Sequence, residues 1–158
     1  MYSPLHAPAG LLIAASIPNP AIGLPLAILS HYVLDSIPHG DLNKPPLMLA
    51  WTEGKRLAIT ELIDLPLAAL VVWRLAPMFP ATPPAYLIAA AIAGIVPDLL
   101  WGGKFLLERI GWNIPGLSPL LALHHRWHEW IHIKEAEDIP FLAGIAYHLA
   151  IVGGLLLL

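Results

Sequence analysis

The sequence contains no cysteine, and this absence excludes both disulfide bonds and thiolate metal ligands. Charged residues are scarce as well, at 12% of the chain, against roughly 25% in soluble domains. The net charge is −3, and no basic patch of the kind that binds nucleic acid is present. Any metal site must therefore use His, Asp and Glu, and no nucleic-acid partner is expected.

Apolar residues, in contrast, account for 58% of the chain. They occur in runs separated by Pro and Gly, a pattern that favours an integral membrane protein in contact with the lipid bilayer. The length fits a single domain that covers residues 1–158. We predict an all-α, polytopic membrane helical bundle of about four to five spanning helices, plus one short or interfacial helix. The oligomeric state stays open.

Apolar runs and helix-breaking residues divide the chain into six predicted helical segments. A spanning helix needs about 17–25 residues, and the first two segments are near the lower limit. The fifth segment is rich in His and Trp, and it could span the membrane, re-enter it or lie at the interface. The segments are 4–17, 21–37, 55–76, 85–101, 118–133 and 141–158. The stretch 104–116 is polar and loop-like, and it could contain a short helix around 105–110.

The end of the second segment, SHYVLDSIPHGD, collects four residues of the types that bind metals. His31 and Asp35 are four positions apart and therefore share one helical face. A proline is expected to end the helix soon afterwards, so that His39 and Asp41 lie in a turn beneath it. Imidazole and carboxylate groups gathered at one point are typical of a divalent metal site.

Further ionisable residues lie inside or at the ends of the other apolar runs. Placing such groups in a bilayer costs free energy, so each of them is a candidate functional residue. Glu61 and Asp64 share a face of the third segment, and Asp98 is expected at the end of the fourth. His6 begins the first segment, and His148 lies near the middle of the last.

The fifth segment contains two neighbouring stripes of ionisable residues. His124, His128 and His132 form one stripe at i, i+4 and i+8, whereas His125 and Glu129 belong to the adjacent stripe. We expect the second stripe to supply a metal ligand, His125, and a candidate catalytic carboxylate, Glu129.

Lys and Arg in the connecting loops predict the orientation, because short basic loops stay on the cytoplasmic side. Lys44 and Lys104 lie in the loops after the second and fourth segments, whereas Arg74 lies toward the other side. The polar residues would thereby gather at the cytoplasmic end of the bundle.

The motifs HYVLDSIPHGD and GIVPDLL, with the preceding His6, resemble the membrane-bound metal-dependent hydrolases, a family of bacteria and archaea. The resemblance implies a prokaryotic cytoplasmic membrane protein. The His-x3-Asp pair at 31 and 35 and the His-x3-Glu pair at 125 and 129 are also similar to the helical ligands of zinc-dependent phospholipase C. There a cluster of zinc ions cleaves phosphodiesters. This chain lacks that enzyme's amino-terminal Trp ligand, and the His after Asp35 follows too soon, which argues against the same trinuclear cluster.

These features together predict a membrane-embedded hydrolase with a divalent transition metal, zinc first and manganese or iron as alternatives. A site at the membrane surface suggests a lipid or phosphoester substrate, with Glu61, Asp64 or Glu129 as the catalytic carboxylate. Two other functions stay open, a metal or proton transporter and a structural membrane protein with buried His/Asp pairs. The expected metal ligands are His6, His31, Asp35, His39, Asp98, His125 and His148.

Overall fold

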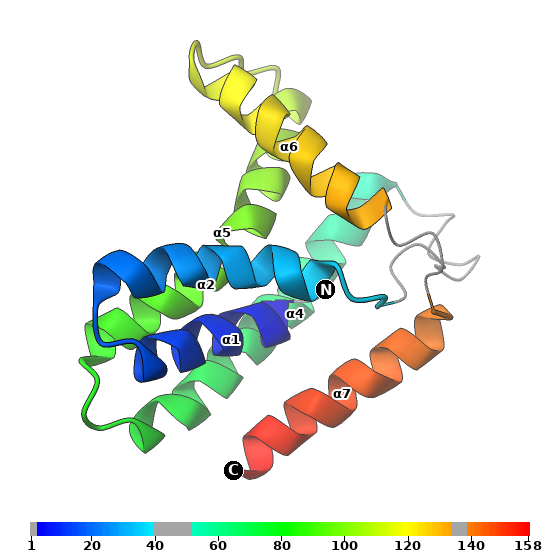
Figure 1. Cartoon of the computed structure of the whole chain (residues 1–158). Helices are drawn as coiled ribbons and strands as arrows, with labels where there is room; N and C mark the ends of the chain where they lie inside the picture. The colour runs from blue at the N-terminus through cyan, green and yellow to red at the C-terminus, as the bar shows by residue number, and fades with distance from the viewer. Residues whose placement is uncertain (1–2, 40–51, 134–138) are drawn as a thin grey trace.

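The structure is a computed structural model that describes residues 3–39, 52–133 and 139–158. These residues form six α-helices and no strand, so the all-α prediction is confirmed for the described part of the chain (Figure 1). The helices are α1 (Ser3–Ser16), α2 (Pro20–Asp35), α4 (Glu53–Leu75), α5 (Pro84–Arg109), α6 (Leu117–Ile133) and α7 (Phe141–Leu157), and a short 3-10 turn, Ala76–Met78, follows α4.

Local sequence explains where two of the helices begin. The side chain of Asn19 caps α2 by accepting a hydrogen bond from the backbone N–H of Ala21, and Pro20 occupies the first turn. Thr52 caps α4 in a similar way, through the backbone N–H of Lys55. The polar and Pro-containing breaks between the apolar runs therefore set these helix boundaries.

The fourth predicted helix is longer than expected. We predicted an end near Trp101 and a loop-like stretch over 104–116 that could contain a short helix around 105–110, whereas α5 continues without a break to Arg109. Pro97 and Asp98 consequently lie in the interior of α5 rather than at its end. An interior proline costs about 3 kcal/mol. Here α1 packs against the part of α5 before Pro97, and α6 packs against the part after it, so tertiary packing keeps the helix continuous.

The central helix of the bundle is α1, which contacts α2, α4, α5 and α7. Gly10 of α1 lies against the backbone carbonyl of Ala90, and Gly94 of α5 lies against the backbone carbonyl of His6. A Cβ atom at either glycine would overlap the facing carbonyl, so the two glycines allow α1 and α5 to approach closely. This close approach leaves His6 fully buried.

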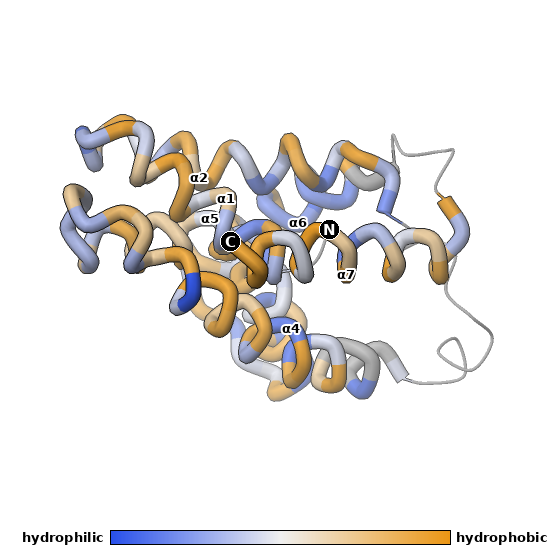
Figure 2. The backbone as a smooth tube through the Cα atoms, turned by 90° about the horizontal axis from the view of Figure 1, so that it is seen from below, coloured by the Kyte–Doolittle hydropathy of each residue, from blue (hydrophilic) through white to orange (hydrophobic). Residues whose placement is uncertain are grey.

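Apolar residues predominate along the helices (Figure 2), and many large apolar side chains are exposed on the outer surface. Among the described residues, α5 alone is long and apolar enough to cross a membrane, whereas α2 and α7 are apolar but shorter. The predicted number of spanning helices therefore stays a prediction.

Candidate metal centre

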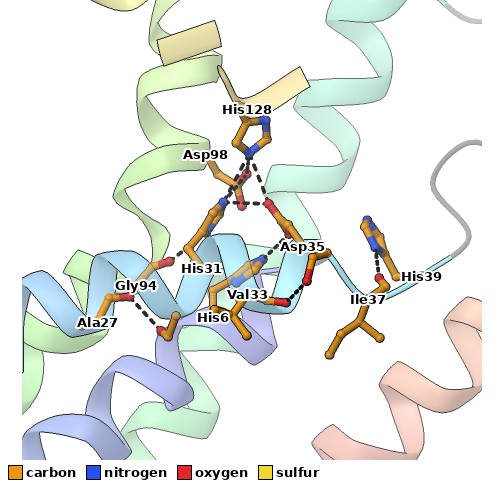
Figure 3. Close-up of polar contacts among 12 residues, drawn as sticks. His6, Ala27, His31, Val33, Asp35, Ile37, His39, Gly94, Asp98 and His128 are labelled. Atoms are coloured by element: carbon orange, nitrogen blue, oxygen red, sulfur yellow. Dashed lines mark hydrogen bonds and ion pairs between the residues drawn. The ribbon is translucent and has the colours of Figure 1, made fainter. Parts of the chain in front are cut away.

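Four ionisable side chains from three helices meet near the end of α2 (Figure 3). His31 and Asp35 come from α2, Asp98 comes from α5, and His128 comes from α6. One ligand atom of each residue lies within 4.8 Å of the ligand atoms of the other three. We name these four residues the donor group, and they could hold a metal ion.

The distances within the donor group fit four-coordinate metal binding. Nε2 of His31 lies 2.9 Å from Oδ2 of Asp35 and 3.5 Å from Oδ1 of Asp98. Nε2 of His128 lies 3.2 Å from the same Asp35 oxygen and 3.6 Å from the Asp98 oxygen, and the two Nε2 atoms are 3.3 Å apart. Tetrahedral ligands at about 2.0–2.1 Å from a zinc ion are separated by about 3.3 Å. The observed spacings therefore match the edges of a tetrahedron around one ion.

A backbone contact determines which nitrogen of His31 faces the other three residues of the donor group. Nδ1 of His31 lies 2.9 Å from the carbonyl oxygen of Gly94. A carbonyl only accepts, so Nδ1–H donates, and Nε2 of the neutral ring carries a lone pair. This lone pair faces carboxylate oxygens of Asp35 and Asp98, which are acceptors too. Acceptors that face one another in a buried place require a cation between them, either a proton or a metal ion.

His6 supports the donor group from the other side of Asp35. Its Nε2 lies 3.1 Å from Oδ1 of Asp35, whereas Oδ2 of Asp35 faces His31 and His128. The His6 ring also stacks on the His31 ring, with the centroids 4.0 Å apart. Partners of this kind orient metal ligands, and their loss costs about ten- to hundredfold in affinity. The structure thus places His6 as a partner of a ligand.

Gly94 links the helix packing to the donor group, because its carbonyl orients His31 and its open Cβ position faces α1. Gly94→Ala should lower the midpoint of thermal unfolding and weaken metal binding, since the added Cβ would overlap the His6 carbonyl. Overpacking of this kind costs about 1–3 kcal/mol. Gly103→Ala is the control on the same helix, because no atom lies within 4 Å of its Cβ position. Equal midpoints for the two variants would contradict this expectation.

Three members of the donor group are buried, and the fourth is partly exposed. The side chains of His31, Asp35 and His128 are 0%, 1% and 7% exposed. The side chain of Asp98 is 24% exposed. The donor group therefore borders the surface of the described structure on the side of Asp98.

When no metal ion is bound, a proton on His128 supplies the positive charge that the facing acceptors require. Burial lowers the pKa of His128, but hydrogen bonds to Asp35 and Asp98 outweigh this effect and raise the pKa to about 9. At neutral pH the proton of His128 thus lies between the two carboxylates. A metal ion needs the lone pair of the same nitrogen, so it must displace this proton.

Metal affinity should therefore depend on pH. Below the His128 pKa of about 9, each bound metal ion should release one proton from His128, so the affinity should rise about tenfold per pH unit from pH 7 upward. Above pH 9 the histidine is already neutral, and this dependence should disappear. Calorimetric titration in buffers of different ionisation enthalpy measures the released proton. An affinity that stays constant between pH 7 and pH 9 would contradict the assignment.

Two predicted ligands, His39 and His148, form a separate buried pair with ring centroids 6.3 Å apart. Nδ1 of His39 lies 2.7 Å from the carbonyl oxygen of Ile37, and Nδ1 of His148 lies 2.7 Å from that of Gly144. Neither histidine belongs to the donor group, and Figure 3 shows His39 apart from it. Asp41, which we predicted in the same turn as His39, lies outside the described residues.

The predicted pair His125 and Glu129 lies against Trp101 rather than in the donor group. Nε1 of Trp101 donates to Oε1 of Glu129 at 3.3 Å, and the His125 ring lies 6.2 Å from the Trp101 ring. The residue that α6 contributes to the donor group is His128, which we had not expected. The sequence carried a signal for it, the neighbouring histidine stripe, but did not show which stripe faces α2.

The two predicted carboxylates of α4 are both partly buried. Glu61 lies near enough to Asp98 for the two negative charges to interact. Oε2 of Glu61 is buried and has no hydrogen-bond partner within the described ranges. Asp64 lies three residues further along α4 and outside the donor group. The charge of Glu61 thus interacts with that of Asp98, the exposed member of the donor group.

Comparisons of the chain with protein-family models, curated proteins and solved structures find no match. The resemblance to membrane-bound metal-dependent hydrolases therefore stays a prediction. The fold and the site define a class of protein in coarser terms. Over residues 3–39, 52–133 and 139–158 the chain is all-helical, and it has a His/Asp group that could hold a metal ion.

Proposed function

We propose that this protein is a membrane-embedded, metal-dependent hydrolase that acts on a phosphoester of a lipid-like molecule. One observation carries the proposal: two imidazole nitrogens and two carboxylate oxygens from three helices converge at tetrahedral spacings. When the rings are neutral, these atoms all present lone pairs to one point, and this arrangement supports a cation site.

Zinc is the metal that we propose for this site. Four nitrogen and oxygen donors at tetrahedral spacings suit zinc, whereas manganese and magnesium prefer six oxygen-rich ligands. The hydrogen bonds around the site also agree with metal binding, because a histidine that binds a metal through one ring nitrogen commonly donates its other N–H to a backbone carbonyl. His31 does so through Gly94.

The difference in exposure suggests how a closed set of four ligands could still serve catalysis. The buried members, His31, Asp35 and His128, comprise two histidines and one carboxylate, which is the ligand composition of several catalytic zinc sites. The exposed member, Asp98, marks the side from which water and substrate would approach. A zinc ion here would lower the pKa of a water molecule and polarise a phosphoryl oxygen.

Exposed apolar side chains on two helices, α2 and α4, support a lipid-like substrate. Leu29 and Val33 of α2 lie on the face of the helix opposite to His31 and are 55% and 64% exposed. Leu62 and Ile63 follow Glu61 on α4 and are 75% and 59% exposed. Exposed apolar surface of this kind is stable against acyl chains but not in water. The two helices would thus place the donor group within reach of the membrane surface.

Glu61 is the residue that we propose as general base. Glu61→Gln should keep the bound metal and lower phosphoester hydrolysis about a hundred- to ten-thousandfold, the usual contribution of a general base. The assay uses a phospholipid in mixed micelles, with metal content measured on the same samples. Glu108→Gln is the control, because Glu108 is exposed and pairs with Lys104. Full activity in Glu61→Gln would remove Glu61 from this role, and no activity in the zinc-loaded wild type on any phosphoester would remove the proposed reaction.

A further inference from the structure

His124 lies one helical turn before His128 on α6 and is not a member of the donor group. Both of its ring nitrogens are buried, and neither has a hydrogen-bond partner in the part of the chain that the structure describes. An imidazole ring carries at least one N–H in every protonation state, so a donor is left unsatisfied here. An unsatisfied buried donor is costly, which indicates that a group outside the described residues supplies its partner.

Ring contacts place His124 beside the donor group. Its ring centroid lies 5.7 Å from that of His128 and 6.4 Å from that of Tyr32. Tyr32 in turn lies 5.5 Å from His31 and 6.3 Å from His128, ring to ring. The charges of His31 and Asp98 both act on His124. The ring N–H of His124 is therefore close enough to the donor group for both to contact the same small bound molecule.

The missing partner is better explained by an oxygen atom of a ligand than by a second metal ion. Within the described residues, the donor group alone brings three or more His or carboxylate ligand atoms within 4.8 Å of one another, and His124 is not part of it. One imidazole is a poor metal site by itself. The same imidazole is a good donor to an anionic oxygen, because such charge-assisted hydrogen bonds are short and strong.

We propose that His124 is a substrate-binding residue, which donates a hydrogen bond to a phosphoryl oxygen of a phosphoester bound at the donor group. This inference rests on the proposed function, because another oxygen of the same phosphoryl group would lie at the metal. Tyr32 packs beside His124 and helps to hold its ring in place. The hydrogen bond does not depend on the charge of His124, since the neutral ring also donates.

Inorganic phosphate is the probe that tests this role, with cobalt(II) as a coloured substitute for zinc. Phosphate binding to the cobalt-loaded protein is followed by the change in the cobalt absorption spectrum. His124→Ala should bind phosphate about ten- to hundredfold more weakly than the wild type, the usual effect of losing a hydrogen bond to a charged group. Cobalt affinity should stay within about threefold, since His124 is not a ligand. His125→Ala is the control, because His125 lies against Trp101, and it should bind phosphate as the wild type does.

A second measurement uses the wild-type protein, in case the alanine variant disturbs α6. With 15N-labelled histidine, the ring signals of His124 should shift when phosphate is added to the zinc-loaded protein. If zinc binds and neither the His124 signals nor the phosphate affinity of His124→Ala change, the partner of His124 is water alone and the inference fails, while the metal site stands. If the wild type binds no divalent metal, both the inference and the proposed function fail.

Discussion

His128→Ala should remove the divalent metal from the purified protein. His128 is one of the four members of the donor group, and its Nε2 contacts a carboxylate oxygen of both Asp35 and Asp98. Without this imidazole, two buried or half-buried carboxylates and one histidine remain, and the tetrahedron is incomplete. Loss of a residue that only hydrogen-bonds to a metal ligand lowers metal affinity about ten- to hundredfold. Loss of His128, which would itself be a ligand, should lower the affinity by more. Elemental analysis after metal-replete expression, followed by competition with a chelating dye, measures the loss.

His125→Ala is the matched comparison, because it removes the same side chain from the same helix. His125 lies against Trp101 and outside the donor group, so its variant should keep the metal at wild-type stoichiometry. The two variants together report which face of α6 is turned toward α2. Metal lost from His125→Ala and kept in His128→Ala would mean that α6 is rotated relative to the structure.

The helices could be predicted from the sequence because their boundaries are local. The break between α1 and α2 is an Asn cap followed by proline, and the start of α4 is a Thr cap. The end of α5 could not be predicted in this way. Its local sequence, with Pro97 and two glycines, favours a helix end, and only the packing of α1 and α6 on either side explains why the helix continues.

The donor group could be predicted only in part. His31 and Asp35 share a helical face by spacing alone, and this spacing needs no knowledge of the fold. His128 could not be chosen over His125, because the two lie on adjacent faces of α6, and the rotation of that helix is set by its contacts with α5 and α2. The sequence also could not show that His39 and His148 lie outside the donor group. Both are buried histidines of apolar segments, but they face each other.

The two aspartates of the donor group should respond differently to removal of their charge. Asp35 is 1% exposed and faces three imidazole nitrogens, those of His6, His31 and His128, at 3.1, 2.9 and 3.2 Å. Asp35→Asn should therefore abolish metal binding. It should also destabilise the protein by about 3–5 kcal/mol, the usual cost of removing one partner from a buried charged group. Asn keeps the shape of Asp, so a cavity cannot account for the loss.

Asp98→Asn should be milder, because Asp98 is 24% exposed and its contacts with His31 and His128 are longer, at 3.5 and 3.6 Å. Water can replace an exposed carboxylate as a ligand, so three protein ligands should still hold the metal, with a smaller loss of affinity than in Asp35→Asn. Metal affinity and unfolding midpoint, measured on both variants, separate the two roles. If Asp98→Asn loses the metal as completely as Asp35→Asn, all four ligands are needed, and the site is a closed, structural one of the kind in which zinc does no chemistry. If only Asp35→Asn loses it, Asp98 marks the position at which a substrate oxygen can enter.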